Sequence, residues 1–97
     1  MNREITEKIR DYFKDQPVLK AWLFGSYARG EQTPESDIDI MVCLDPKEDV
    51  SLLKLANMYG SLNDLLGVKV DLVTDKGLMD FARQSVNEDK ILLYERI

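Results

Sequence analysis

Two aspartates stand at the start of a strongly apolar segment, and this arrangement limits the possible folds more than any other feature of the chain. The segment runs from Asp37 to Leu44, and Asp37 and Asp39 are its only charged residues. Side chains alternate between the faces of a strand, so both carboxylates point to one side, about 6–7 Å apart along the backbone. The other face carries only aliphatic side chains. We therefore expect a strand with one buried face and one acidic face.

The two carboxylates need solvent or a counter-charge. At a separation of about 5 Å they repel by about 3 kcal/mol at an effective dielectric constant near 20, against about 1 kcal/mol in water. A hard divalent cation such as Mg²⁺ removes this repulsion and takes carboxylate oxygens as ligands. A bare Asp-x-Asp pair is more often a solvated strand end, so the interpretation depends on the neighbouring residues.

A glycine and a serine lie between this segment and an earlier apolar run. Gly25-Ser26 directly follows residues 18–24. A Gly-Ser pair that opens a helical turn leaves backbone N–H groups and a hydroxyl free to hold phosphate oxygens. Taken alone, an ordinary strand-to-helix turn with Ser26 as N-cap explains the pair better. Beside the two aspartates, it predicts an anion site next to a metal site.

The order and spacing of these motifs resemble a known family. Residues 25–30, Gly-Ser-Tyr-Ala-Arg-Gly, followed by residues 36–39, Ser-Asp-Ile-Asp, are similar to the signature of the DNA polymerase β-type nucleotidyltransferase superfamily. For a chain of 97 residues the resemblance is to the minimal nucleotidyltransferases (MNT) of bacteria and archaea. It implies an α+β fold: a small mixed β-sheet of three core strands, with a short edge strand, packed with helices.

Composition limits the class of protein. A length of 97 residues predicts a single domain, residues 1–97, and an apolar fraction of 44% with a charged fraction of 32% is typical of a folded soluble protein. The net charge of −5, without a basic cluster, argues against direct nucleic-acid binding. The absence of histidine excludes the usual zinc sites and Ser-His or Cys-His nucleophile pairs.

The single cysteine and the absence of long apolar stretches predict a cytoplasmic protein. Cys43 has no partner for an internal disulfide and is expected to be a reduced core residue. The N-terminal residues are charged and are followed by no apolar stretch long enough for a signal peptide or a membrane span.

Hydrophobic periodicity predicts alternating helices and strands. We expect a helix at 3–15 ended by Pro17, a strand at 18–24, a helical turn at 26–29, a loop at 31–35 and a strand at 37–44. A long helix at 50–66, closed by Gly67, would bury one face made of Leu52, Leu55, Ala56, Tyr59, Leu62 and Leu66. A third strand at 68–73, a helix at 78–86 and a short edge strand at 91–94 complete the prediction.

A third aspartate interrupts the third strand. A strand, a helix and another strand form a crossover unit of neighbouring parallel strands, so the strands at 37–44 and 68–73 should lie side by side. If Asp71 faces the same way as Asp37 and Asp39, three carboxylates converge, as in the superfamily pattern. The alternative is a surface acid paired with Lys69.

The resemblance assigns roles to the three acids. It implies two Mg²⁺ ions, about 3.5–4 Å apart in enzymes of this kind, and ATP as the substrate. Asp37 and Asp39 would share the metals. Asp71 would hold the metal on the acceptor side and help to take the acceptor's proton.

The phosphate-binding residues follow from the same resemblance. Gly25 and Ser26 would bind the β- and γ-phosphates. Arg29 would either neutralise phosphate charge or tie its loop to Asp37 or Glu35, and Ser36 would be either a ligand or a cap at the strand entry.

The chain offers no domain for the acceptor, so we expect another polypeptide to present it. The resemblance implies a HEPN-type toxin encoded nearby, with transfer of AMP to a hydroxyl, typically of a tyrosine, by a type VII-like antitoxin. A homodimer and a hetero-oligomer with the toxin are both compatible with this interpretation. The alternatives are an antitoxin that neutralises by binding alone and a small-molecule nucleotidyltransferase of the antibiotic-modifying type. A nucleic-acid polymerase is the least favoured.

Overall fold

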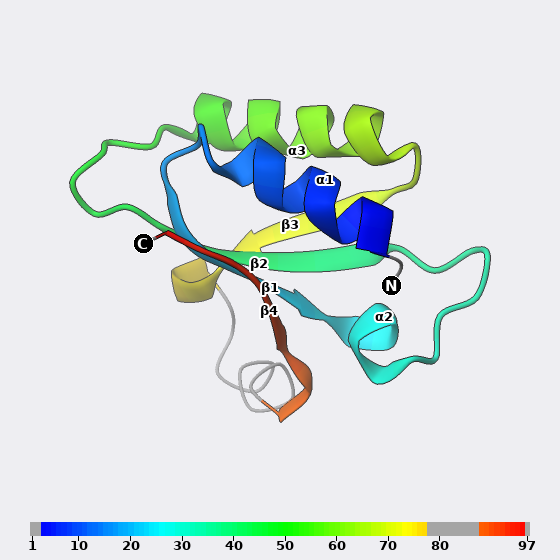
Figure 1. The fold of residues 1–97 in the computed structure, drawn as a ribbon. Coiled ribbons are helices and arrows are strands. Elements are labelled where there is room, and N and C mark those ends of the chain that lie inside the picture. The colour runs from blue at the N-terminus through cyan, green and yellow to red at the C-terminus, as the bar shows by residue number, and fades with distance from the viewer. Residues whose placement is uncertain (1–2, 78–87, 97) are drawn as a thin grey trace.

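A four-stranded sheet with two helices on one face forms the body of the protein (Figure 1). The structure is a computed structural model that describes residues 3–77 and 88–96. The strands are β1 Val18–Phe24, β2 Ile38–Leu44, β3 Val70–Thr74 and β4 Ile91–Glu95. The helices are α1 Arg3–Phe13, α2 Gly25–Arg29 and α3 Leu52–Leu66, and a 3-10 turn, Asp75–Gly77, follows β3.

The strands lie in the order β3-β2-β1-β4. β1 pairs antiparallel with β2 and with β4, whereas β2 and β3 run parallel and are joined through α3. The mixed sheet of three core strands and an edge strand expected from the sequence is confirmed.

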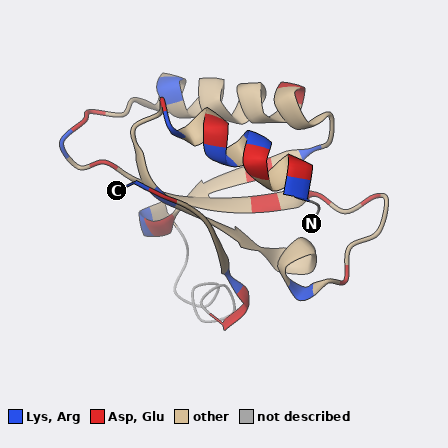
Figure 2. Cartoon of the chain, viewed as in Figure 1, with Lys and Arg blue, Asp and Glu red and all other residues tan. Residues whose placement is uncertain are grey.

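The core lies between the sheet and the two long helices. The aliphatic face of β2 forms its centre, and Ile38, Ile40 and Val42 are fully buried. Ile9 and Phe13 of α1 and Met58 and Leu62 of α3 pack onto the same cluster. Figure 2 shows the complementary pattern: charged segments alternate along α1, while β2 is uncharged apart from one acidic band.

Local signals explain where the helices end. α1 ends at Phe13, before Pro17, whose ring cannot continue a helix. Ser51 caps α3 by accepting a hydrogen bond from the backbone N–H of Lys54. Gly67 closes α3 with a φ of 68°, and its N–H donates to the carbonyl of Asn63. No helix in the described ranges has the length and apolar character needed to cross a membrane.

The apolar face predicted for α3 is wrong in part. Met58 and Leu62 are buried, whereas Leu52 is 82% exposed and Tyr59 is 41% exposed. Ala56 is also exposed. Two stripes of residues with helical spacing can be drawn on α3, and the other leucines of the predicted face belong to both. The packing of α3 against α1 and β3 buries the stripe that contains Met58.

The third strand begins two residues later than predicted. Gly67 turns the chain out of α3, so Val68 and Lys69 lie in the connection and stay exposed. The helix predicted at 78–86 lies outside the described residues. The edge strand predicted at 91–94 is present as β4.

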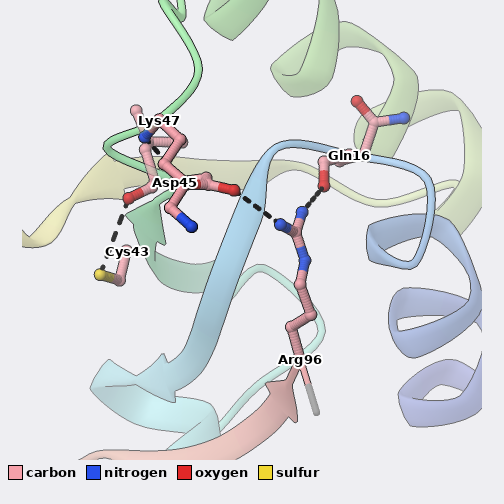
Figure 3. A network of polar contacts seen from close by, with 6 residues as sticks. Gln16, Cys43, Asp45, Lys47 and Arg96 are labelled. Atoms are coloured by element: carbon pink, nitrogen blue, oxygen red, sulfur yellow. Dashed lines mark hydrogen bonds and ion pairs between the residues drawn. The ribbon is translucent and has the colours of Figure 1, made fainter.

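An ion pair and hydrogen bonds join neighbouring segments at the C-terminal end of β2, the end opposite Asp37 and Asp39. Asp45 follows β2 directly, and its carboxylate accepts hydrogen bonds from Nη1 of Arg96, at 2.7 Å, and from the backbone N–H of Lys47, at 2.9 Å (Figure 3). Arg96 also donates through Nη2 to the carbonyl of Gln16, at 2.7 Å. Arg96 therefore ties the end of β4 to the segments that flank β1 and β2.

Candidate functional site

Asp39 and Asp71 are direct partners in the parallel ladder between β2 and β3. The pairs on either side, Ile38 with Val70 and Ile40 with Leu72, belong to the core or pack against it. Because side chains alternate along both strands, Asp39 and Asp71 point together to the opposite face of the sheet. The structure therefore brings together two of the acids singled out in the sequence.

The electrostatic state of Asp39 reflects this crowding. Burial, then the charge of Asp71 and a hydrogen bond between the two carboxyl groups, and then the charge of Asp37 raise the pKa of Asp39 to about 6. The charge of Arg29 opposes this rise in the pKa. The raised pKa means that Asp39 binds a proton more readily than an ordinary aspartate does.

Asp37 lies at the entry to β2 and is paired with a lysine. Lys69 Nζ lies 3.4 Å from Asp37 Oδ2, and the backbone N–H of Ile38 donates to the carbonyl of Lys69 at 3.0 Å. The alternative drawn from the sequence paired Lys69 with Asp71. The observed ion pair is with Asp37, because the register that aligns Ile38 with Val70 also sets the preceding residues, Asp37 and Lys69, side by side.

Gly25 is fitted against the carboxylate of Asp39. It directly follows β1, whose last residue, Phe24, is the ladder partner of Asp39. The φ of Gly25 is +72°, in the left-handed region. A Cβ at this position would overlap Asp39 Oδ2 and lie 3.1 Å from its carboxyl carbon. Backbone conformation and space therefore both require glycine here.

Ser26 and Arg29 lie on α2, the short helix that begins at Gly25. Ser26 is half-buried in the first turn. Arg29 donates from Nε to Glu31, at 2.6 Å, and from Nη1 to Asp89, at 3.2 Å. The expectation that Arg29 would tie its loop to Asp37 or Glu35 is wrong in its partners, because the guanidinium spans from its own loop to the segment just before β4.

Ser36 takes part in the loop that leads into β2. Its hydroxyl accepts a hydrogen bond from the backbone N–H of Thr33, at 2.9 Å, and lies 3.3 Å from the Thr33 hydroxyl. Its backbone N–H donates to the Thr33 carbonyl. These bonds favour the capping role considered for Ser36 and leave its binding to phosphate a prediction.

The donor set suits a hard divalent cation. Within residues 3–77 and 88–96, no three acidic or thiol side chains are already arranged around one cation position. Adjacent carboxylates are nevertheless a fitting pair of oxygen ligands, since a divalent cation relieves the repulsion between them. Asp39 and Asp71 would supply the first two ligands, and Asp37 could follow once it leaves Lys69.

The sequence does not predict the partners of two residues near the site, since it offers Lys69 only as a partner of Asp71 and gives Asp89 no role. Lys69 holds Asp37, and Asp89 holds Arg29. A signal for Lys69 was present: it stands two residues before Asp71, as Asp37 stands two residues before Asp39. No local signal pointed to Asp89, because its contact joins residues 60 positions apart.

The chain is similar to known proteins over most of its length. Residues 4–93 match the family described as "Nucleotidyltransferase domain". A Methanocaldococcus jannaschii protein named "Putative protein adenylyltransferase MJ1379" is 44% identical over 91 residues, which cover 92% of this chain and 91% of that protein. The Thermococcus cleftensis protein named "Protein adenylyltransferase MntA" is 48% identical over 61 residues, which cover 63% of this chain and 60% of that protein.

A solved structure described as a toxin-antitoxin with AMP-PNP shares the fold. Its similar chain superposes with a TM-score of 0.79 at 27% identity, over 94% of this chain and 73% of that chain. The minimal nucleotidyltransferase resemblance seen in the sequence is thereby confirmed. The family match over residues 4–93 and the relatives show that the chain belongs to the nucleotidyltransferase domain family.

Proposed function

We propose that this protein transfers AMP from ATP to a hydroxyl group, typically of a tyrosine, on a HEPN-type toxin, and so acts as its antitoxin. The single observation that carries the proposal is the facing pair Asp39 and Asp71 beside Gly25, at the end of β1. The names of the relatives and the toxin-antitoxin neighbour with AMP-PNP support the choice of AMP and of a protein acceptor.

The acids of this site fit the reaction. The acceptor oxygen attacks the α-phosphorus of ATP, the bond from that phosphorus to the oxygen bridging the β-phosphorus breaks, and diphosphate leaves. Bound Mg²⁺ would supply stabilisation of negative charge on the entering and leaving oxygens. Asp37, Asp39 and Asp71 would hold it, and Asp71 would help to take the proton of the acceptor hydroxyl.

The glycine turn and its neighbours would bind the nucleotide. Gly25 and Ser26 would hold the β- and γ-phosphates from the start of α2. Arg29 lies close enough to Asp39 for its charge to act on the pKa of that group, and it would face the same phosphates. Its bonds to Glu31 and Asp89 would then orient it for this contact.

The direct test incubates the chain with ATP, Mg²⁺ and the purified partner and measures the partner's intact mass. We expect the mass to rise by one or more AMP units. An Asp71→Asn variant should leave the partner mass unchanged, whereas Asp64→Asn, the same change at an exposed position on α3, should behave like the wild type. A partner that stays unmodified with folded wild-type protein contradicts the proposal.

A growth assay separates catalysis from neutralisation by contact. An Asp37→Asn, Asp39→Asn double variant should fail to protect cells that express the partner toxin. Protection at the wild-type level, with the variant still bound to the toxin, would instead establish the binding antitoxin considered from the sequence.

A further inference from the structure

We propose that Lys69 is a positioning residue that occupies Asp37 in the cation-free protein and thereby sets the divalent-cation concentration at which the acidic site fills. The inference rests on the proposed function, because it assumes that the acids on this face hold a cation. It concerns a residue outside the glycine turn and the three acids.

The backbone places Lys69 and Asp37 together. The hydrogen bond from the N–H of Ile38 to the carbonyl of Lys69 joins the entries of β2 and β3 at 3.0 Å. This bond brings Lys69 beside Asp37, the residue before Ile38. Their side chains form the ion pair, with Lys69 Nζ 3.4 Å from Asp37 Oδ2. The lysine therefore reaches the acid from the connection that leads into β3.

The ammonium of Lys69 contacts Asp37 and acts on Asp71 through its charge. Its pKa is raised first by the hydrogen bond to Asp37, then by the charge of Asp37 and then by that of Asp71. The ammonium thus offsets part of the repulsion in a group of three carboxylates. A cation bound by Asp37 would take over this role, so the cation and the Lys69 ammonium compete for one carboxylate.

The exposure of the two side chains indicates that the exchange is easy. The side chain of Lys69 is 62% exposed and that of Asp37 is 32% exposed. An exposed lysine can turn into solvent when its partner binds a cation, and exposed ion pairs contribute little stability. Lys69 therefore tunes cation affinity without blocking the site.

The experiment measures binding of Mn²⁺, by electron paramagnetic resonance of the free ion, to the protein alone, without nucleotide or partner. Lys69→Met keeps the length of the side chain and removes its charge, and we expect it to bind Mn²⁺ about fivefold more tightly, the upper range for an exposed ion pair. Lys69→Arg should stay within about twofold of the wild type, because the ion pair is kept.

Two controls test whether the effect passes through Asp37. Lys76→Met removes the same charge from the 3-10 turn after β3, about 15 Å along the strand from Asp71, and should change the affinity by less than about twofold. In an Asp37→Asn background, Lys69→Met should also change the affinity by less than about twofold. Circular dichroism checks that each variant is folded, and Lys69→Gln replaces Lys69→Met if the latter is not.

The outcomes distinguish this inference from the proposed function. If wild-type protein binds Mn²⁺ and Lys69→Met binds it no more tightly than Lys76→Met does, the role of Lys69 is excluded while the cation site stands. An equal gain from Lys69→Met in the Asp37→Asn background also excludes it. If wild-type protein binds no Mn²⁺ at millimolar concentration, the cation site and the role of Lys69 fail together, whatever the result of the transfer assay.

Discussion

The two ends of β2 carry the same residue type in opposite electrostatic surroundings. Asp39 faces Asp71 and lies close to Asp37, and its pKa is raised to about 6. Asp45, directly after the strand, accepts hydrogen bonds from the backbone N–H of Lys47 and from Arg96, and its pKa is lowered. One end therefore crowds like charges, whereas the other satisfies its acid with donors.

The Asp45 end of β2 stabilises the fold, whereas the Asp39 end carries the candidate site. A hollow of about 750 Å³ lies at the Asp45 end, lined by side chains of both signs that include Lys14, Glu48 and Arg96. Asp45 is already paired with Arg96, so its carboxylate helps to join neighbouring segments of the chain. At the other end the carboxylates oppose one another, which costs stability unless a cation or proton intervenes. Crowding of like charges, and not the size of a hollow, marks the candidate site.

The largest expected effect comes from making one substitution at both ends. Asp39→Asn should reduce AMP transfer by at least about 100-fold, because the proposed function makes Asp39 a direct metal ligand, whose loss costs more than loss of the groups that support one. Asp45→Asn should leave the rate within about twofold of the wild type, since it touches only the distant end of β2. The measurement is the initial rate of partner modification at saturating ATP.

A similar loss of AMP transfer in both variants would contradict the contrast between the two ends of β2. It would mean that the Asp45 network holds the acidic face in place through β2, and that the two ends are not independent. A normal rate in Asp39→Asn would remove Asp39 from the site altogether.

A smaller effect is expected from two glycines with the same backbone conformation. Gly25 and Gly30 both have a φ of +72°, but a Cβ at Gly30 would meet nothing within 4 Å. Gly30→Ala should therefore show only the cost of a left-handed conformation, about 1–2 kcal/mol of unfolding free energy, with transfer retained. Gly25→Ala adds the overlap with Asp39 and should lower stability by about 3 kcal/mol and abolish transfer. Urea unfolding and the transfer assay measure the two effects.

The glycine comparison can also fail in an informative way. Equal losses in the two alanine variants would show that only backbone strain matters, and that the carboxylate of Asp39 moves aside freely. The contact between Gly25 and Asp39 would then not define the shape of the site.

The sequence predicts the elements that depend on local patterns. β1 is found at the predicted residues, and Gly67 ends α3 as expected, because strand alternation and a left-handed cap are written in neighbouring residues. The adjacency of the strands that carry Asp39 and Asp71 also follows, since a crossover of this kind joins neighbouring parallel strands, whereas the pairing of the two acids depends on the register that the structure shows.

Long-range choices could not be predicted in the same way. The stripe of α3 that contains Met58 is selected by α1 and β3, and helical spacing fits either stripe equally well. The partners of Lys69 and Arg29 depend on strand register and on a contact with Asp89, which lies far away in the sequence. Where an acid could pair with several basic residues, its partner is not known until the register of the strands is known.

The smallest expected effect is on stability as a function of pH, and its sign is opposite at the two ends of β2. The folded-state pKa of Asp39, about 6, lies above its ordinary value of 3.8, so the folded protein binds more protons than the unfolded chain between these values. The contribution of Asp39 to stability is therefore present in acid and is lost as the pH rises through about 6. The folded-state pKa of Asp45 lies below 3.8, so its contribution is present above that pH and is lost as the pH falls.

Thermal unfolding without divalent cations, from pH 4 to pH 8, tests both signs. Asp39→Asn should melt a few degrees above the wild type at pH 8 and converge with it near pH 4, because the amide removes the repulsion that appears when the carboxyl group ionises. Asp45→Asn should melt below the wild type at pH 8, since Arg96 then loses its charged partner. Mg²⁺ should reduce the difference in melting temperature between the wild type and Asp39→Asn but not that between the wild type and Asp45→Asn, because a cation relieves repulsion only at the Asp39 end of β2. If Asp39→Asn melts below the wild type at pH 8, the carboxylates at this end are already compensated within the fold, and the contrast between the two ends of β2 does not hold.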